Sequence, residues 1–298
     1  MKNGLSLVFS ITKRILMLQV TWSLLLVFLF SCKETTTENQ KVSVFESIDS
    51  KSSGLVFNNE LSYDEEFNVY LYKSFYNGSG VGLGDLNNDG LLDVIFCGNQ
   101  VDNKMYLNKG DLKFQDVTEI SGLSSPNVWS TGVSIVDINA DGWLDIYICK
   151  SGNEGGKNRH NELFINQGIP EGDHIPKFIE SAASYGIDNI GLSVHASFFD
   201  MDKDGDLDMY LLNNSISPSE IIIDSKKGLR NKRDLGGGNK LYRNDGTTFT
   251  DISEEAGIYG SSIGYGLGVS IGDVNRDTWP DIYVSNDFFE RDYLYINN

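Results

Sequence analysis

A nine-residue pattern that occurs four times constrains this chain more than any other feature of its sequence. The copies are DLNNDGLLD (Asp85–Asp93), DINADGWLD (Asp137–Asp145), DMDKDGDLD (Asp200–Asp208) and DVNRDTWPD (Asp273–Asp281). Each copy has Asp at positions 1, 5 and 9 and Asp or Asn at position 3. One such stretch is an ordinary turn sequence, but four copies in similar surroundings indicate a structural repeat.

The acidic side chains of each copy lie too close together to be stable as isolated charges. Neighbouring carboxylates raise one another's pKa unless a cation lies among them, and oxygen-only ligands suit Ca²⁺. The third copy is similar to the first half of an EF-hand loop, with Gly205 at the sharp turn. Position 12, however, is Leu211 in a strand-like run rather than the Glu of an EF-hand. We therefore expect Asp208 to close a calcium loop inside a β-hairpin.

We expect the cation ligands to be side-chain oxygens at positions 1, 3, 5 and 9, with a backbone carbonyl after the turn, which is that of Leu207 in the third copy. The expected set is Asp85, Asn87, Asp89, Leu91 and Asp93; Asp137, Asn139, Asp141, Trp143 and Asp145; Asp200, Asp202, Asp204, Asp206, Leu207 and Asp208; and Asp273, Asn275, Asp277 and Asp281. Plain solvated turns are the alternative, because Asp, Asn and Gly are common in hairpins.

The fourth copy departs from the pattern after position 5. Thr278 replaces the turn glycine and Pro280 follows at position 8. A β-branched residue resists the left-handed backbone that glycine adopts freely. We therefore predict three calcium sites that follow the full pattern and a fourth that binds more weakly or has altered geometry.

The sequence around the loops predicts four short strands per repeat. The expected segments are 80–84, 131–136, 194–199 and 266–272 before the loops; 93–98, 145–150, 208–213 and 281–286 after them; 103–108, 161–166, 239–244 and 292–297 third; and 113–123, 177–187 and 248–258 fourth. The loops recur after 52, 63 and 73 residues. Four-stranded units at such intervals predict an all-β fold of propeller blades.

The two ends of the repeat region are atypical. Val44–Leu55 (VFESIDSKSSGL) is similar to a fourth-strand segment, but no loop precedes it. The last repeat stops after its third strand. We therefore expect a leading outer strand, three full blades and a truncated fourth blade within 44–298, in a fragment of a longer protein. An open or oligomeric assembly is the alternative, and it would leave sheet edges exposed.

The N-terminus has the features of an export signal. Lys2, Lys13 and Arg14 precede the apolar run 15–30, which is short for a membrane span. The following Leu-Phe-Ser-Cys ends at Cys32 and resembles a bacterial lipobox, which implies a signal peptide over 1–31, lipidation of Cys32 and a polar tether over 32–43. Lys33-Glu34 resembles the surface-export signal of Bacteroidota lipoproteins. A plain signal peptide or a single membrane anchor are the alternatives to an outer-membrane lipoprotein.

The cysteines, tryptophans and basic residues of the repeat region also suggest roles. Cys97 and Cys149 occupy equivalent positions in their repeats, and we expect both to be buried free thiols rather than a disulfide. Trp129, Trp143 and Trp279 are expected to pack between blades, with sugar stacking as the alternative. The insertion 215–238 carries Lys226, Lys227, Arg230, Lys232 and Arg233, a solvated loop or a docking site for an acidic ligand.

The phrases GVGLGDLNNDGLLD and GLGVSIGDVNRDTWPDIYVSNDF resemble the FG-GAP/VCBS repeat family, whose calcium-loop propellers include the integrin α head. They are most similar to bacterial VCBS lipoproteins that carry an ASPIC/UnbV domain and are related to cartilage acidic protein. The resemblance covers about residues 44–298 and implies a calcium-stabilised β-propeller. An ASPIC/UnbV domain would lie C-terminal to this chain's end.

Composition limits the classes of function. The formal net charge of −18 argues against a nucleic-acid partner. The chain has no zinc-type His/Cys spacing, nucleophile elbow, phosphate loop or dinucleotide fingerprint. We therefore expect a binding or adhesion module for a glycan or protein ligand. An enzyme, or an enzyme subunit acting on polysaccharide, and a scaffold of a surface complex remain alternatives.

Overall fold

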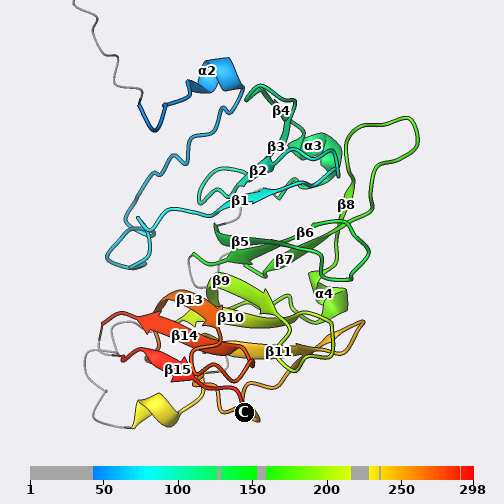
Figure 1. Cartoon of the computed structure of the whole chain (residues 1–298). Coiled ribbons are helices and arrows are strands. Elements are labelled where there is room, and N and C mark those ends of the chain that lie inside the picture. The colour runs from blue at the N-terminus through cyan, green and yellow to red at the C-terminus, as the bar shows by residue number, and fades with distance from the viewer. Residues whose placement is uncertain (1–42, 126–128, 153–158, 216–227, 235, 289) are drawn as a thin grey trace, which may run out of the picture. The chain divides into compact units, whose positions relative to one another are not determined.

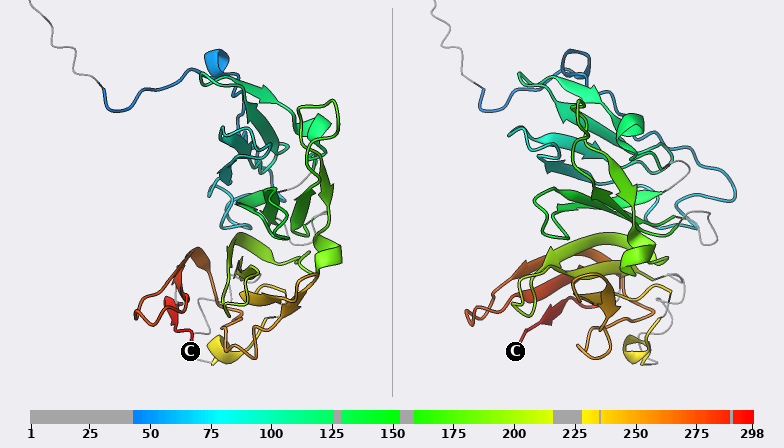
Figure 2. Two further views of the ribbon diagram at one scale, coloured as in Figure 1. Left: turned by 45° about the vertical axis from the view of Figure 1, so that its right-hand side comes forward. Right: turned by 90° about the vertical axis from the view of Figure 1, so that its right-hand side faces the viewer.

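The computed structural model describes residues 43–125, 129–152, 159–215, 228–234, 236–288 and 290–298 (Figures 1 and 2). The chain divides into two units, Met1–Ser47 and Ile48–Asn298, and all four repeats belong to the second. The expected signal peptide and Cys32 lie outside the described residues. Among the residues that are described, no helix has the length and apolar character needed to span a membrane.

The second unit is built from antiparallel sheets whose strands follow one another in chain order. The first sheet holds β1 (Val81–Gly84), β2 (Asp93–Phe96), β3 (Lys104–Asn108) and β4 (Phe114–Asp116). The second holds β5 (Ser130–Val136), β6 (Asp145–Lys150), β7 (Glu162–Asn166) and β8 (Phe178–Glu180). The third holds β9 (Leu192–Phe199), β10 (Asp208–Asn214), β11 (Lys240–Asn244) and β12 (Phe249–Asp251). The fourth holds β13 (Gly266–Gly272), β14 (Asp281–Asn286) and β15 (Tyr293–Tyr295).

The prediction of an all-β fold with four-stranded units is confirmed. Every strand falls within, or within two residues of, a segment predicted from the repeat, and the fourth sheet has three strands. No backbone pairing among the described residues joins the first sheet to the fourth, so the arrangement is open. Each sheet is a meander of the kind found in propeller blades.

The two middle sheets bury both of their faces, because successive side chains of a strand point to opposite sides. In β6, Ile146 and Ile148 join the core between the first and second sheets. Tyr147 and Cys149 join the core between the second and third sheets. In β10, alternate side chains likewise contribute to the core between the second and third sheets and to the core on the other face of the third sheet. A shift of one residue in the register of β6 would therefore exchange its two sets of core contacts.

Small residues let the first strands of neighbouring sheets approach one another closely. A Cβ atom added at Gly132 in β5 would lie 2.5 Å from the carbonyl oxygen of Val194 in β9. One at Gly82 in β1 would lie 2.8 Å from the side chain of Ile135 in β5. Thr131 Oγ1 also donates to the carbonyl of Ser193 across the same gap (2.7 Å). Glycine at these positions is thus required for packing between sheets.

A short helix that ends in a left-handed glycine follows the fourth strand of the first and second sheets. The helices are α3 (Thr118–Ser121), which ends at Gly122, and α4 (Ala182–Tyr185), which ends at Gly186. A Cβ at Gly122 would meet the carbonyl oxygen of Phe178 in the next sheet at 2.9 Å. Each of these corner helices therefore packs, at its C-terminal glycine, against the start of the outer strand of the next sheet.

The helix α2 (Ser50–Ser53) forms the same corner against the first sheet. It ends at left-handed Gly54, where a Cβ would meet the carbonyl oxygen of Phe114 at 2.4 Å. Lys113 Nζ donates to the carbonyl of Ser52, as Lys177 Nζ donates to that of Ile120 in α3. The second half of 44–55 therefore has the helix and left-handed glycine that follow the fourth strand in the first two sheets.

The expected outer strand at the start of 44–55 is not formed. Residues 43–49 have no strand pairing, and Asp49 caps α2 by accepting from the N–H of Ser52 (3.0 Å). An outer strand is held by the third strand of its own sheet. Among the described residues, no backbone pairing joins this segment to a third strand, and β15 of the fourth sheet has no outer strand beside it.

The second sheet also contains a buried ion pair that the sequence did not lead us to expect. Lys150 at the end of β6 has no exposed surface, and its Nζ pairs with Glu162 Oε1 at the start of β7. Ser125 Oγ donates to both Glu162 oxygens (2.7 and 2.8 Å). Burial lowers the pKa of Lys150, and the adjacent carboxylate opposes that shift.

We predict that Glu162→Gln lowers the free energy of unfolding by about 3–5 kcal/mol, because it leaves the Lys150 ammonium buried without a counter-charge. The double variant Lys150→Met/Glu162→Leu should be much closer to the wild type, since it removes both charges. Urea unfolding of the two variants measures the difference. Equal losses in both would show that packing, rather than charge, determines the effect.

Candidate calcium loops

The ninth residue of each loop is an Asp that is fully buried and bonded by backbone N–H groups. One oxygen accepts from position 2 of the loop, which is Leu86, Ile138, Met201 or Val274 (2.9, 3.0, 2.8 and 2.8 Å). The other accepts from an Asn at or just after the end of the third strand, which is Asn108, Asn166, Asn244 or Asn297 (2.8, 2.8, 2.9 and 3.0 Å). The ninth Asp therefore ties the loop to the third strand of its own sheet.

In the first, second and fourth loops, the side chains at positions 1, 3 and 5 bond within the loop itself. In the first loop, Asp85 accepts from the N–H groups of Asp89 (3.0 Å) and Gly90 (2.8 Å). Asn87 Nδ2 donates to Asp89 Oδ2 (3.0 Å). The second and fourth loops repeat these three bonds with nearly the same lengths. Asn at position 3 thus supplies a donor between two carboxylates.

All four loops share two left-handed residues, at positions 4 and 6. Position 4 is Asn88, Ala140, Lys203 or Arg276, with φ between +55° and +67°. Position 6 is glycine in the first three loops and Thr278 in the fourth, where φ is +77°. The Thr278 N–H donates to Asp273 Oδ2 (2.8 Å), as the glycine N–H does in the first two loops.

The expectation that Thr278 alters the loop geometry is therefore wrong, while weaker binding there stays a prediction. A non-glycine residue in this conformation costs about 1–3 kcal/mol of strain. Contacts from the third loop offset part of that cost. Lys203 Nζ donates to Thr278 Oγ1 (2.8 Å) and lies 4.0 Å from the centroid of the Trp279 ring. The adjacent loops are thus joined through one ammonium group.

The third loop differs from the other three, because Asp202 replaces Asn at position 3. Among the described residues, Asp200 accepts no bond from positions 5 and 6, and only Asp206 N–H to Asp204 Oδ1 (3.1 Å) remains of the internal network. Asp200 Oδ1 and Asp206 Oδ1 are buried without a hydrogen-bond partner. Buried oxygens of this kind require a partner, and a bound cation would supply one.

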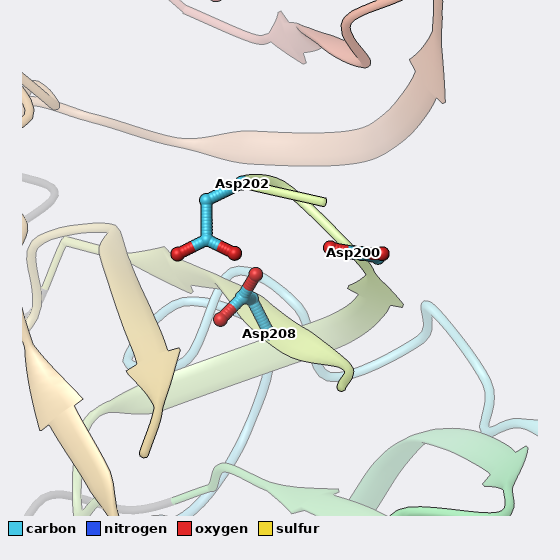
Figure 3. Close-up of side chains that lie close together, drawn as sticks. All are labelled: Asp200, Asp202 and Asp208. Atoms are coloured by element: carbon cyan, nitrogen blue, oxygen red, sulfur yellow. The ribbon is translucent and has the colours of Figure 1, made fainter. Parts of the chain in front are cut away.

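Three carboxylates of the third loop converge at one point (Figure 3). Asp200, Asp202 and Asp208 each offer one oxygen, and the three oxygens lie within 4.8 Å of one another. Asp200 directly follows β9, and Asp208 begins β10, so the hairpin itself brings them together. Among the described residues this is the one group of three acidic or other ligating side chains that meets this criterion. An all-oxygen donor set fits Ca²⁺.

Leu207 does not stand where the expectation placed it. It occupies position 8, and its carbonyl accepts from Asn244 Nδ2 (3.2 Å). The carbonyls of Leu92 and Leu144, at position 8 of the first two loops, accept from Asn108 and Asn166 in the same way (3.0 and 3.1 Å). The residue at position 7 of the third loop, equivalent to Leu91 and Trp143, is Asp206.

Burial raises the pKa of the ninth Asp in the first three loops. Asp93, Asp145 and Asp208 each reach a pKa of about 6, because burial disfavours the ionised form and the neighbouring loop carboxylates add to the effect. In the fourth loop, the N–H of Asn297 instead lowers the pKa of Asp281. Burial and the adjacent Asp204 raise the pKa of Asp206. A cation in these loops would oppose the upward shifts.

The remaining predicted residues divide into three groups. Cys97 and Cys149 are buried free thiols that belong to different cores, since each points toward the next sheet. Trp129 is buried, but it packs against Tyr72 and Phe75 of the segment before β1 rather than between two sheets. Trp143 and Trp279 are half-buried at position 7 of their loops. In the insertion 215–238, Lys226 and Lys227 lie outside the described residues. Two of its other basic residues are engaged internally, Arg230 with Glu290 (2.6 Å) and Arg233 with the carbonyl of Ile258 (2.6 Å).

Comparison with known families agrees with this geometry. The model of the FG-GAP-like repeat matches residues 85–148, which hold the first and second loops, and residues 231–284, which hold the fourth. These two regions of the chain are similar to FG-GAP-like repeats. The third loop lies between the two matches, yet its strands and ninth Asp follow the same plan as the other loops. No curated protein matches the chain.

The residue at position 3 should determine how strongly each of the four loops depends on calcium. We predict that Asp202→Asn raises the melting temperature in chelator and reduces the gain on adding calcium, because the amide restores a donor between carboxylates. Asn87→Asp should do the reverse in the first loop. Each effect should correspond to about 0.5–1.5 kcal/mol, the contribution of one hydrogen bond. Thermal melts with calcium and with chelator measure both variants, and shifts of the same sign would contradict the idea.

The raised pKa values predict a calcium effect that depends on pH. Without calcium, Asp93, Asp145 and Asp208 contribute stability below pH 3.8 that is lost as the pH rises to about 6, because the folded state holds their protons more tightly. Calcium favours the ionised forms, so its stabilising effect should be small near pH 4 and full above about pH 7. Melting curves across this range test the trend, which a constant calcium effect would refute.

Proposed function

We propose that the FG-GAP repeats of this chain form a calcium-stabilised binding module of the β-propeller type. FG-GAP repeats are compatible with such an adhesion-like module. The observation that carries the proposal is the third loop, where one oxygen each of Asp200, Asp202 and Asp208 lie within 4.8 Å of one another, and where Asp200 Oδ1 and Asp206 Oδ1 are buried without a hydrogen-bond partner. The role of the ion is structural, since each loop joins two strands of one sheet.

The four loops contribute unequally to this proposal. The third loop needs a cation to coordinate its buried carboxylate oxygens, which have no hydrogen-bond donor. In the first, second and fourth loops, backbone N–H groups already donate to the Asp at position 1. We propose binding at all four, with the third loop responsible for the largest calcium-dependent gain in stability. Calcium then adds to the free energy of folding by binding the folded state alone.

The proposed setting is the outer membrane, with the repeats held by a lipid on Cys32 and the ligand a glycan or a protein. The basic run that leads to 15–30 and the lipobox-like residues before Cys32 support this setting. An enzymatic role has less support, because the buried Lys150–Glu162 pair is closed off from solvent.

A calcium titration of the full chain by calorimetry tests the proposed function, and Mg²⁺ serves as the comparison ion. We expect one site to dominate the heat of binding and Asp200→Asn to abolish it, while Asp85→Asn removes a weaker site. Mg²⁺ should compete poorly, since it requires a tighter octahedral shell. A folded chain that binds no calcium, or Asp200→Asn that binds as the wild type does, would refute the proposal.

A further inference from the structure

A second candidate site lies outside the calcium loops, in the segment between α2 and β1. It is a pocket of about 560 Å³, within the roughly 300–1,000 Å³ that is usual for small-molecule sites. Its lining includes three tyrosines, Tyr63, Tyr70 and Tyr76, and two carboxylates, Asp64 and Glu65. Neither lysine nor arginine is among the described residues that line it.

Local hydrogen bonds hold the rim of this pocket in place. Asp64 Oδ1 accepts from the N–H groups of Glu66 (2.8 Å) and Phe67 (2.7 Å). Asn68 Oδ1 accepts from the N–H of Tyr70 (2.9 Å), and Asn68 Nδ2 donates to the carbonyl of Asp64 (2.8 Å). The two turns therefore stabilise each other, and they fix the backbone that carries Glu65 and Tyr70.

Buried anchors attach the same segment to the sheets. The rings of Phe67, Tyr72 and Phe75 pack on Trp129, with centroid distances of 5.0, 5.4 and 5.3 Å. Tyr72 OH donates to Ser151 Oγ (2.9 Å) beyond the end of β6, and Ser74 Oγ is 2.7 Å from Tyr265 OH beside β13. The pocket is therefore preformed, which lowers the entropic cost of binding a ligand.

The pocket tyrosines are exposed although their neighbours are buried. Tyr63, Tyr70 and Tyr76 are 73%, 83% and 61% exposed, whereas Tyr72 and Phe75 in the same segment are 8% and 0% exposed. Tyr76 is also held edge-on against Phe75, at a centroid distance of 5.0 Å. Aromatic rings presented in this way offer their faces to a ligand.

The chemistry of the lining favours a cation. An aromatic ring face attracts an ammonium group, and carboxylates nearby add an attraction of the same sign. The chain supplies an example, since Lys73 Nζ lies 5.9 Å from the centroid of the Tyr70 ring. An anionic ligand would meet two carboxylates and no basic residue among those that line the pocket.

We propose that this pocket binds an organic ammonium cation, with the ring of Tyr70 and the carboxylate of Glu65 as its main partners. The inference rests on the binding part of the proposed function and is independent of the calcium part. It is separate from the docking of an acidic ligand on 215–238, which stays a prediction, although Arg230 and Arg233 have internal partners.

Choline and its neutral isostere 3,3-dimethyl-1-butanol are the probes, titrated by calorimetry into the full chain with saturating calcium. We expect choline to bind about tenfold more tightly than the isostere, because only choline gains the cation–π and carboxylate attraction. Tyr70→Ala should weaken choline binding by about tenfold and Glu65→Gln by about threefold. The matched control Tyr70→Phe should bind as the wild type does, since it keeps the ring face.

Lys73→Gln separates the proposal from a neutral-ligand site. Removing the chain's own ammonium should tighten choline binding by about threefold, because the two cations compete for Tyr70. A neutral disaccharide would not respond to this change. Equal binding of choline and the isostere, no effect of Tyr70→Ala, or displacement by cellobiose in place of choline would overturn the inference. Melting curves of the same samples with calcium and with chelator show whether the calcium module is intact, so a failure of either proposal is recognised separately.

Discussion

The structure depends above all on one buried carboxylate in each repeat. The ninth Asp of the loop accepts two backbone hydrogen bonds, one from the loop and one from the third strand. Charged acceptors form stronger hydrogen bonds than neutral ones, and a buried carboxylate that lost either donor would pay the cost of desolvation. The same side chain therefore sets the turn between the first two strands and the register of the third.

Packing between sheets follows from that local order. Because the two middle sheets have both faces covered, alternate residues of β6 and β10 contribute to two different cores. Glycines on the first strands then allow neighbouring sheets to approach. The corner helices α2, α3 and α4 complete the contact at the outer edge. The loop, the alternation of side chains along the strands and the corner helix act together, which is why the repeat extends beyond the nine residues of the loop.

The strands were predictable from the sequence because the chain contains four copies of one repeat, and their common pattern marks where each strand begins. The interval between Asp85 and Asp93, for example, places β1 and β2 on either side without any knowledge of long-range contacts. Features that occur once were not predictable. The segment around Tyr72 has no counterpart in the other repeats, and its anchors on Trp129, Ser151 and Tyr265 come from distant parts of the chain. The conformation of Thr278 was misjudged, because propensity disfavours it while the surrounding loop imposes it.

The most instructive difference between the repeats is the side chain at position 3 of the loop, which is an Asn amide in three loops and an Asp carboxylate in the third. In the first loop, an amide nitrogen of Asn87 lies 3.0 Å from the carboxylate of Asp89 and screens its charge. In the third loop, the equivalent Asp202 has no hydrogen to donate, and the oxygens of Asp200, Asp202 and Asp208 instead face one another. A donor in the sequence and a cation from solution thus solve the same electrostatic problem. Under the proposed calcium role, the choice between them decides whether a loop is stable alone or requires a metal, and it can differ from loop to loop while the strands remain the same.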